Sequence, residues 1–334
     1  MGLSMVHALF LTLFLLCLKT KAEDSSPTRK LAGACNLFRG KWVYDASYPL
    51  YDPSSCPFID PQFNCQKHGR SDQLYQKYRW TPFSCPLPRP SGVVQLKFLL
   101  CRFNGLDFLQ KYRGKKIMFV GDSLSLNQFN SLACMIHAWV PKSRSTFSQR
   151  DALSKVTFED YGLEIYLYRT AYLVDLDREK VGRVLKLDSI KNGDSLLKDM
   201  NRFVAYYKGL TTWAKWIERN VNPSETKLFF LGISPVHYQG RDWNEPAKSC
   251  MSETQPFFGV KYPAGTPMAW VVVNKVLKRI KKPVYFLDVT TLSQYRKDAH
   301  PEGYSGVMPV DCSHWCLPGL PDTWNQLLTA VLSA

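Results

Sequence analysis

Two short motifs, far apart in the chain, carry residue types that could perform acyl chemistry. Gly121-Asp122-Ser123 follows an apolar run, and Asp311 precedes His314 by three positions near the end of the chain. A serine hydroxyl becomes a useful nucleophile when a neighbouring histidine accepts its proton and an acid orients that histidine. The two motifs together predict a triad of Ser123, His314 and Asp311.

Each motif also has an ordinary structural interpretation. A Gly-Asp-Ser sequence is typical of a strand-to-helix turn in which Ser123 or Asp122 caps the helix, and this is the commoner case for the motif alone. The spacing of Asp311 and His314 is equally weak by itself. Only their joint occurrence, in this order and in these contexts, favours catalysis.

The elements around the serine would place it where an oxyanion can be stabilised. Residues 115–120 form a short apolar run typical of a buried parallel strand, and residues 124–137 have helical spacing. Ser123 would then lie where free backbone N–H groups and the helix dipole face a developing negative charge. Asn127, one helical turn further on, would donate to the oxyanion or orient the loop.

A second polar group follows another expected strand, at residues 227–233. His237 lies just beyond this strand, where α/β proteins bind ligands, and Arg241 and Asn244 follow it. The arrangement favours a sugar site at the edge of the sheet, while a buried structural histidine fits equally well. The candidates for oxyanion or substrate contacts are Gly121, Asp122, Asn127, His237, Arg241 and Asn244.

Strands and helices alternate along most of the chain. This alternation predicts an α/β fold with a parallel sheet flanked by helices. The further expected elements are a hairpin (156–158 with 163–168), a long amphipathic helix (194–220), strands at 227–233 and 284–289, and helices at 268–280 and 321–332.

The first residues indicate the compartment. Residues 8–18 are a compact apolar run, and small or polar residues follow it up to Ala22. This pattern predicts a secretory signal peptide over residues 1–22. The run is shorter than the roughly 20 residues of a membrane span, and an uncleaved signal anchor is the alternative.

Nine cysteines follow Cys17, and in an oxidising compartment they predict disulfides. Residues 35–89 are rich in cysteine, proline and tyrosine with little periodicity, which indicates an irregular lobe held by disulfides. A zinc site needs paired ligands at short spacing, and only Cys312 and Cys316 with His314 approach this, so no metal is expected. His68, His137 and His300 have no partner that the sequence identifies, and a structural role is their default.

The charge of the chain bears on its partners. Forty-three Lys and Arg against 28 Asp and Glu give a net charge of +15, which favours polyanions. An acidic polysaccharide fits a secreted chain better than nucleic acid, for which no binding motif is present. A role of the charge in solubility alone is as compatible with the composition.

Eight stretches of the chain match a known family closely. They are Cys35-Asn-Leu-Phe-Arg-Gly-Lys-Trp-Val-Tyr-Asp45, Tyr48-Pro-Leu-Tyr51, Cys56-Pro-Phe-Ile59, Tyr78-Arg-Trp80, Arg113-Gly-Lys115, Phe119-Val-Gly-Asp-Ser-Leu-Ser-Leu-Asn-Gln128, Tyr168-Arg-Thr170 and Asp311-Cys-Ser-His-Trp-Cys-Leu-Pro-Gly-Leu-Pro-Asp-Thr-Trp-Asn325. With them the chain resembles the plant trichome birefringence-like proteins, over nearly all of its mature length. The resemblance implies a fold similar to the GDSL/SGNH esterases, with an acyl-esterase-like domain over residues 103–334.

The resemblance also implies an activity and a site. The activity is O-acetylation of a cell-wall polysaccharide such as xylan or pectin in the Golgi lumen, by a protein that is membrane-anchored or secreted to the wall. Ser123, His314 and Asp311 match the family's triad. The acetyl donor, acetyl-CoA or an acetylated intermediate, would be a substrate; no tightly bound cofactor and no stable protein partner are expected. The implied disulfides are Cys35–Cys85, Cys56–Cys134, Cys65–Cys316 and Cys250–Cys312.

The chain departs from the family pattern at two places. Residues 90–102 resemble an insertion, and within it Cys101 has no expected partner. Between Gly193 and Ser195 relatives carry a further strand, which should be central to the sheet and help to build the oxyanion site. Three functions therefore remain open: a polysaccharide O-acetyltransferase, an acetylesterase with the same triad, and a non-catalytic binder of wall polysaccharide.

Overall fold

A computed structural model describes residues 36–83, 103–171, 176–179, 182–185 and 201–333. Residues 35–334 make one compact unit. The predicted signal segment (1–22), the insertion (90–102), Cys35, Cys85, Cys101 and residues 194–200 of the expected helix lie outside the described residues. No helix in the described part has the length and apolar character needed to cross a membrane.

A strand and the helix that follows it carry the candidate nucleophile. Strand β3 (Lys116–Gly121) leads through Asp122 into helix α4 (Ser123–His137), as predicted. Asp122 caps the helix, because its Oδ1 accepts a hydrogen bond of 2.9 Å from the Leu124 N–H. Helix α4 is buried along most of its length between β3, β6 and helix α8 (Leu320–Ser333), so its amino end has a defined position.

The sheet that contains β3 has four strands in the order β3-β6-β5-β4. Strands β5 (Leu153–Phe158) and β6 (Leu163–Arg169) form the predicted antiparallel hairpin, and β6 runs parallel to β3. Strand β4 (Ser145–Arg150) was not predicted. Its side chains are almost all exposed, so no alternation of apolar and polar residues marks it.

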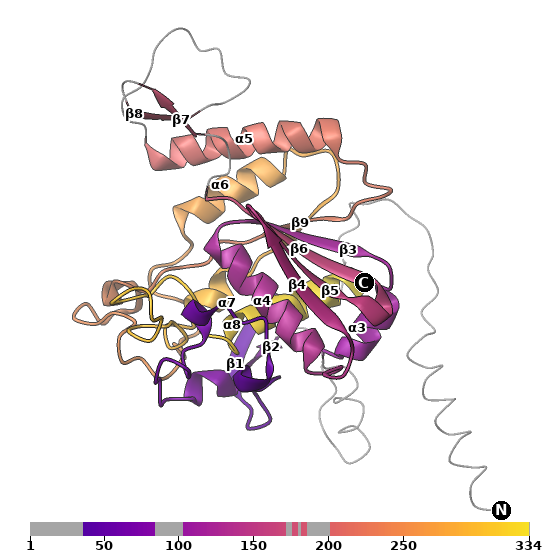
Figure 1. Ribbon diagram of the computed structural model, residues 1–334. Helices are drawn as coiled ribbons and strands as arrows, with labels where there is room; N and C mark the ends of the chain where they lie inside the picture. The colour runs from indigo at the N-terminus through magenta and orange to yellow at the C-terminus, as the bar shows by residue number, and fades with distance from the viewer. Residues whose placement is uncertain (1–35, 84–102, 172–175, 180–181, 186–200, 334) are drawn as a thin grey trace, which may run out of the picture. The chain divides into compact units, whose positions relative to one another are not determined.

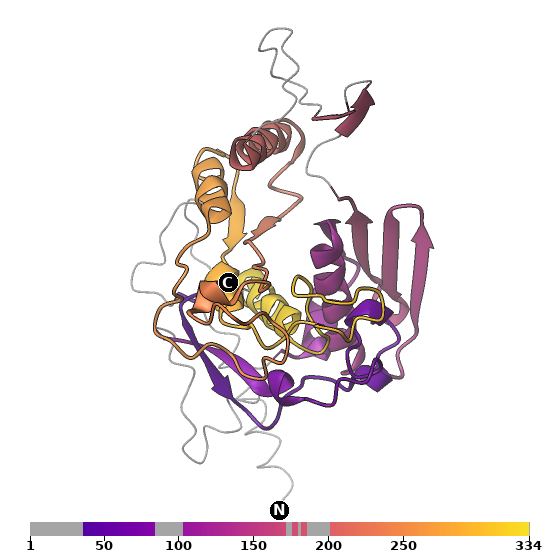
Figure 2. The same ribbon diagram turned by 90° about the vertical axis from the view of Figure 1, so that its left-hand side faces the viewer.

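Two further strands form a separate parallel pair. Strands β9 (Leu228–Leu231) and β10 (Val284–Leu287) pair with each other, and helices α5 (Arg202–Asn220) and α6 (Met268–Leu277) pack together beside them. The two views show this group beyond the open edge of β3 (Figures 1 and 2). The α/β class is thus confirmed, but among the described residues the sheet is divided and many of its pairings are antiparallel.

Strand β3 has an open edge and an exposed face among the described residues. Among the described strands, β3 pairs only with β6 and β9 only with β10. Met118 and Val120 of β3 are 55% and 61% exposed, whereas Phe119 between them is buried. A central strand of an α/β sheet is normally covered on both faces, whereas Met118 and Val120 leave one face of β3 exposed.

The cysteine-rich lobe is less irregular than predicted. Strands β1 (Gly40–Tyr44) and β2 (Tyr78–Pro82) pair in antiparallel fashion, with short 3-10 turns at Pro53–Ser55, Pro61–Phe63 and Leu74–Lys77 between them. Most of its aromatic residues belong to the main core, which also contains Trp315 and Trp324. The Trp42 indole N–H donates to the Leu292 carbonyl at 2.8 Å. The lobe and the acyl-esterase-like part therefore share one core.

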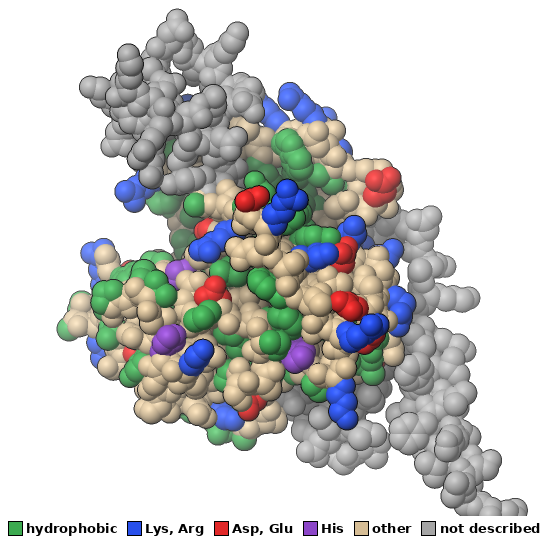
Figure 3. All heavy atoms as spheres, viewed as in Figure 1, with side chains coloured by type: hydrophobic (Ala, Val, Ile, Leu, Met, Phe, Trp, Pro, Cys, Tyr) green, Lys and Arg blue, Asp and Glu red, His purple; other side chains and the backbone are tan. Residues whose placement is uncertain are grey.

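The remaining elements are short. They are helices α3 (Gly105–Lys111) and α7 (Thr290–Gln294), strands β7 (Leu176–Glu179) and β8 (Gly182–Leu185), and 3-10 turns at Glu159–Tyr161 and Gly240–Trp243. On the face drawn in Figure 3, the Lys and Arg side chains are spread over the surface with acidic side chains among them. That face shows no single basic patch.

Candidate active site

The three residues of the predicted triad meet in space. His314 Nε2 lies 2.7 Å from Ser123 Oγ, and His314 Nδ1 lies 2.7 Å from Asp311 Oδ2. Both distances are those of good hydrogen bonds, and each ring nitrogen has one partner. The geometry suits a serine that gives its proton to His314 while Asp311 fixes the ring.

Asp311 is held as a carboxylate. Its side chain is 2% exposed, and Oδ1 accepts hydrogen bonds from the backbone N–H groups of Ser313 and His314, at 3.0 and 3.1 Å. Burial alone would raise the pKa of Asp311, but these bonds and the bond from the His314 ring outweigh burial and hold the pKa well below its ordinary value. Asp311 therefore stays charged and can stabilise a protonated His314.

The loop of residues 311–317 is anchored at almost every backbone position. Its partners lie in four separate parts of the chain, so its shape depends on the whole fold. The bonds are Asp311 with Glu302 (2.7 and 2.9 Å), His237 N–H to Cys312 O (2.9 Å), Cys316 N–H to Ala299 O (3.0 Å), Leu317 N–H to Phe63 O (2.9 Å), and Trp315 with Asn127.

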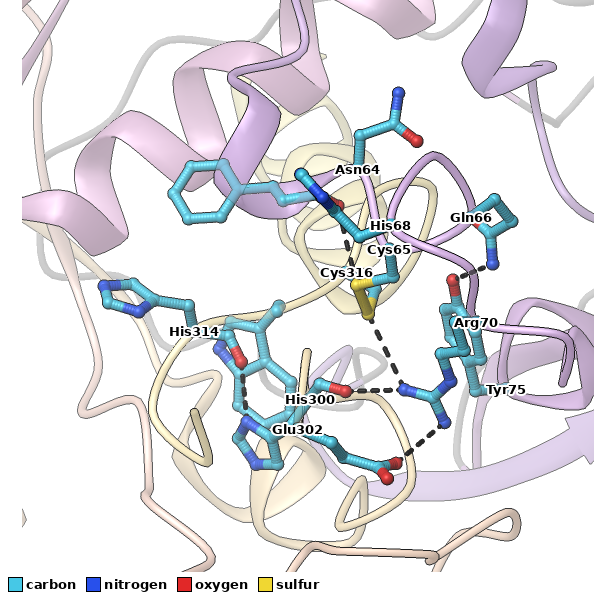
Figure 4. Close-up of a disulfide and its surroundings, with 12 residues drawn as sticks. Asn64, Cys65, Gln66, His68, Arg70, Tyr75, His300, Glu302, His314 and Cys316 are labelled. Carbon is cyan, nitrogen blue, oxygen red and sulfur yellow. Dashed lines mark hydrogen bonds and ion pairs between the residues drawn. A yellow bond between two sulfur atoms is a disulfide. The ribbon is translucent and has the colours of Figure 1, made fainter. Parts of the chain in front are cut away.

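Disulfides fasten the same loop. The structure contains Cys56–Cys134, Cys65–Cys316 and Cys250–Cys312, three of the four pairings that the family resemblance implies. Two of these bonds hold the loop on either side of His314. Figure 4 shows the bond between Cys65 and Cys316 beside the His314 backbone. The implied Cys35–Cys85 bond falls outside the described residues.

The turn before Ser123 requires glycine. Gly121 has φ +153°, and a methyl group at its Cα would overlap the hydroxyl of Ser125. The first N–H groups of a helix have no partner within it, and of these the Leu124 N–H is taken by Asp122. The Ser123 N–H and the positive end of α4 thus lie at the nucleophile, where an acyl oxygen would gain negative charge.

Asn127 acts on the loop. Its side-chain N–H donates to the Trp315 carbonyl at 3.0 Å, and its Oδ1 accepts from the Trp315 N–H at 2.9 Å. The residue is fully buried. Of the two predicted roles, these bonds show Asn127 orienting the loop, and its burial keeps the amide away from the surface.

His237 is not a surface residue. Its ring is fully buried, and its nitrogens contact His300 and the Gln294 carbonyl. The prediction of a sugar contact through His237 is corrected, because no face of the ring is open to a ligand. Arg241, on the 3-10 turn at Gly240–Trp243, and Asn244, which follows that turn, are exposed.

Three residues near the triad were not anticipated as members of the site. His300 contacts the His314 carbonyl at 2.6 Å, and the ring of Phe63 lies 5.6 Å from the His314 ring. Tyr206 of α5 lies close to Asp122; burial, and then this carboxylate, raise the pKa of Tyr206 to about 12. Phe63 and Tyr206 are far from the triad in sequence, and His300 precedes His314 by 14 positions, so no local motif could have identified them.

The described side chains do not gather into a metal centre: no group of three or more His, Cys, Asp or Glu residues is placed to hold an ion. The proton relay, the charged acid and the helix amino end are instead the parts of a serine acyl-transfer site. An α/β fold that carries such a site is typical of the class of serine acyl esterases and acyltransferases.

Comparison with known proteins agrees with this class. The family described as "GDSL/SGNH-like Acyl-Esterase family found in Pmr5 and Cas1p" matches residues 100–195 and 188–331, and the "PMR5 N terminal Domain" matches residues 33–86. Two Arabidopsis thaliana relatives, protein trichome birefringence-like 39 and 40, are each 56% identical, over 94% and 90% of this chain and 91% and 88% of their own lengths. The chain belongs to the trichome birefringence-like family.

The comparisons also bear on the predicted loss of a strand. The acyl-esterase family matches in two segments that meet at residues 188–195. The alignment with the trichome birefringence-like 39 protein runs over 347 positions, more than the 334 residues of this chain, so that relative has residues which this chain lacks. The sheet of the described strands is divided, and the loss of a strand between Gly193 and Ser195 stays a prediction.

Proposed function

We propose that this protein is an O-acetyltransferase that acetylates a plant cell-wall polysaccharide, pectin or xylan, through an acetyl-Ser123 intermediate. The observation that carries the proposal is the pair of 2.7 Å contacts joining Ser123, His314 and Asp311. Membership of an acyl-esterase family supports the acyl chemistry. The geometry favours an enzyme over a non-catalytic binder, because a binder would not need this relay.

The first half-reaction forms the acetyl-enzyme. His314 Nε2 accepts the proton of Ser123 while Oγ attacks the acetyl carbonyl carbon of the donor. The carbonyl oxygen gains negative charge beside the amino end of α4, whose N–H groups stabilise it. The bond to the leaving group then breaks, and the leaving group takes the proton from His314.

The second half-reaction transfers the acetyl group. A sugar hydroxyl gives its proton to His314 and attacks the acetyl carbon, and Ser123 leaves and regains a proton. Water in place of the sugar would make the same site an acetylesterase. The two activities share every step before the acceptor arrives, so the triad supports both.

The proposal extends to the location and the donor. Three disulfides fit a chain that folds in an oxidising compartment, and residues 1–22 would direct it into the secretory pathway. The reaction would take place in the Golgi lumen or in the wall. Acetyl-CoA or another acetyl ester would serve as a substrate rather than as a bound cofactor.

The test is capture of the acetyl-enzyme. Purified protein is mixed with a labelled acetyl donor, quenched and digested, and the acetylated peptide is sequenced by mass spectrometry. We expect the label on Ser123 in the wild type and none in Ser123→Ala. Ser125→Ala is the matched control: this hydroxyl lies on the same turn, and its oxygen contacts the Val120 carbonyl at 3.4 Å rather than His314.

Adding de-acetylated pectin or xylan then identifies the acceptor. Label that moves to one polymer establishes the transferase and its substrate, whereas label released only as free acetate would make the protein an acetylesterase. If correctly folded protein binds a polymer but never becomes acetylated, the catalytic proposal is wrong.

A further inference from the structure

Two buried histidines lie in contact behind the triad, and the proposed reaction uses neither. His237 Nδ1 lies 2.6 Å from His300 Nε2, and both rings are completely buried. The two outer nitrogens face backbone carbonyl oxygens: His237 Nε2 lies 2.9 Å from Gln294 O, and His300 Nδ1 lies 2.6 Å from His314 O. The contacts through the two rings therefore end on the backbone of the catalytic histidine (Figure 4).

Counting protons shows that two neutral rings cannot make all three contacts. A carbonyl oxygen only accepts, so His237 Nε2 and His300 Nδ1 must both carry hydrogen to bond their carbonyls. A neutral imidazole has a single N–H, and both hydrogens are then used. The two inner nitrogens would face each other with lone pairs at 2.6 Å. A third proton removes this conflict, because one inner nitrogen then donates to the other.

We propose that His237 and His300 share one additional proton, so that the pair carries a single positive charge and holds the His314 backbone in place. Both are positioning residues, since neither contacts the reacting atoms. Their role rests on the proposed acyl chemistry, while the protonation of the pair can be tested separately. The pair would join the loop that bears the catalytic histidine to helix α7 through the Gln294 carbonyl.

The aromatic surroundings suit a cation. The ring of His300 stacks on Trp315 with 4.0 Å between centroids. The rings of Trp243, Tyr262 and Trp315 surround His237 with centroids at 5.5, 6.3 and 6.1 Å. Aromatic rings attract a cation most strongly where water is excluded, as it is here.

The surroundings of the pair include groups that lower the pKa of the two histidines and groups that raise it. Burial is the largest effect and lowers the pKa of both rings, so that the pKa of His237 falls to about 4, while the bonds to the Gln294 and His314 carbonyls act in the opposite direction. Lys297 lowers the pKa of His237 and Arg70 that of His300, whereas Asp311 raises the pKa of His300. Both cations have carboxylate partners of their own, which weaken their effect: Glu253 for Lys297 and, at 3.2 Å, Glu302 for Arg70.

The shared proton would affect catalysis through His314. When the pair loses its proton, one of its three contacts must open, and the loop is then held less firmly. Misplacing a catalytic group by about 1 Å costs up to roughly a hundredfold in rate. We therefore expect the reaction to lose about tenfold in kcat/KM as the pair deprotonates on the alkaline side.

Nuclear magnetic resonance of the wild-type protein, with ring-¹⁵N-labelled histidine, tests the proton count directly. At pH 6 we expect three slowly exchanging ring N–H protons from the two buried histidines. The third should disappear as pH rises. Two N–H protons at pH 6 would overturn the proposal, whatever the activity of the protein.

Variants test the link to catalysis. In His237→Gln the amide can donate to His300 Nε2 without adding charge, so His300 keeps its N–H for the His314 carbonyl. We expect the wild-type pH profile of kcat/KM to have an alkaline limb that His237→Gln lacks, while both keep the acid limb. His68→Gln is the control, because His68 is exposed and its ring contacts the Pro61 carbonyl rather than either buried histidine.

The outcomes separate this inference from the proposed function. Three N–H protons in a protein without acyl activity would support the shared proton and contradict the enzyme. An alkaline limb that persists unchanged in folded His237→Gln, or that vanishes equally in His68→Gln, would rule out the positioning role of the pair.

Discussion

The loop of residues 311–317 and strand β3 meet at Ser123, yet their backbones are held very differently. The loop has a disulfide on each side of His314 and hydrogen bonds to four other parts of the chain. Strand β3 has one neighbouring strand among those described, and two of its side chains are more than half exposed. One partner in the relay is clamped, and the other lies at an open edge.

This difference shows what the catalytic geometry depends on. Ser123 is placed by the Asp122 cap and by the buried helix α4, not by a strand on the open side of β3. His314 is placed by covalent and polar contacts that cross the whole chain. The relay can therefore assemble although the sheet of the described residues is divided, and the open edge of β3 should reduce stability more than it disturbs the triad.

The largest effect should come from breaking the relay at either end. Ser123→Ala and His314→Ala should each lower kcat by roughly four to six orders of magnitude, because both half-reactions need both groups. The double variant should lose little more than either single one, since triad members act as a unit. Additive losses, or near-normal activity in one single variant, would remove the triad from the mechanism.

The stability effects of substitutions on the two faces of β3 can be compared directly. Phe119 is buried against the core, and Phe119→Ala should lower the free energy of unfolding by about 3–5 kcal/mol. Met118→Ala, on the open face, should cost less than about 0.5 kcal/mol. Urea titration of both variants measures the contrast. A large loss from Met118→Ala would show that something covers this face in solution.

Two disulfides that close loops of similar length can test how the loop of residues 311–317 is held. Cys250–Cys312 and Cys56–Cys134 close loops of similar length, with separations of 62 and 78, so removing either should cost about 4 kcal/mol of unfolding free energy. Only Cys312 is next to Asp311. Replacing both cysteines of each bond by serine should therefore lower kcat/KM of the folded protein only for Cys250–Cys312. Equal losses of activity would mean that the Cys250–Cys312 bond has no special role in placing the catalytic loop.

Residue chemistry and local periodicity account for most of what could be predicted. Ser123, Asp311 and His314 stood out because their types and order suit one reaction, and β3, α4 and the β5–β6 hairpin because their apolar spacing is regular. The exposed β4 had no such signal. The disulfide pairings came from family resemblance alone, because nine cysteines allow many arrangements.

Contacts between distant parts of the chain were the limit of prediction. His237 and His300 are 63 positions apart, and nothing near either residue marks them as neighbours. His237 was predicted at a sugar site because it follows a strand, but burial under Trp243, Tyr262 and Trp315 overrides that position. Asn127 had two possible roles, and only the place of Trp315 decides between them.

A smaller effect, on the pH dependence of stability, is expected from Asp311. Its pKa is lower in the folded than in the unfolded protein, so between the two values the unfolded chain binds more protons and stability rises with pH. Asp311 should thus contribute about 1–3 kcal/mol near neutrality, lost as pH falls below about 4. The stability difference between wild type and Asp311→Asn, from urea titrations at pH 7 and pH 3, should shrink accordingly. A constant difference would mean that the carboxylate charge is not what stabilises the loop.

The smallest effect concerns the charge of the substrate. The net charge of +15 should favour a polyanion such as de-esterified pectin over neutral xylan, and salt should weaken the preference. Because the basic side chains on the face in Figure 3 are spread among acidic ones, we expect only a few-fold difference in Kd at low salt. Binding of both polymers at low and high ionic strength measures it. Equal affinities at low salt, or a preference that salt does not change, would mean that sugar geometry selects the acceptor and that the charge only keeps the protein soluble.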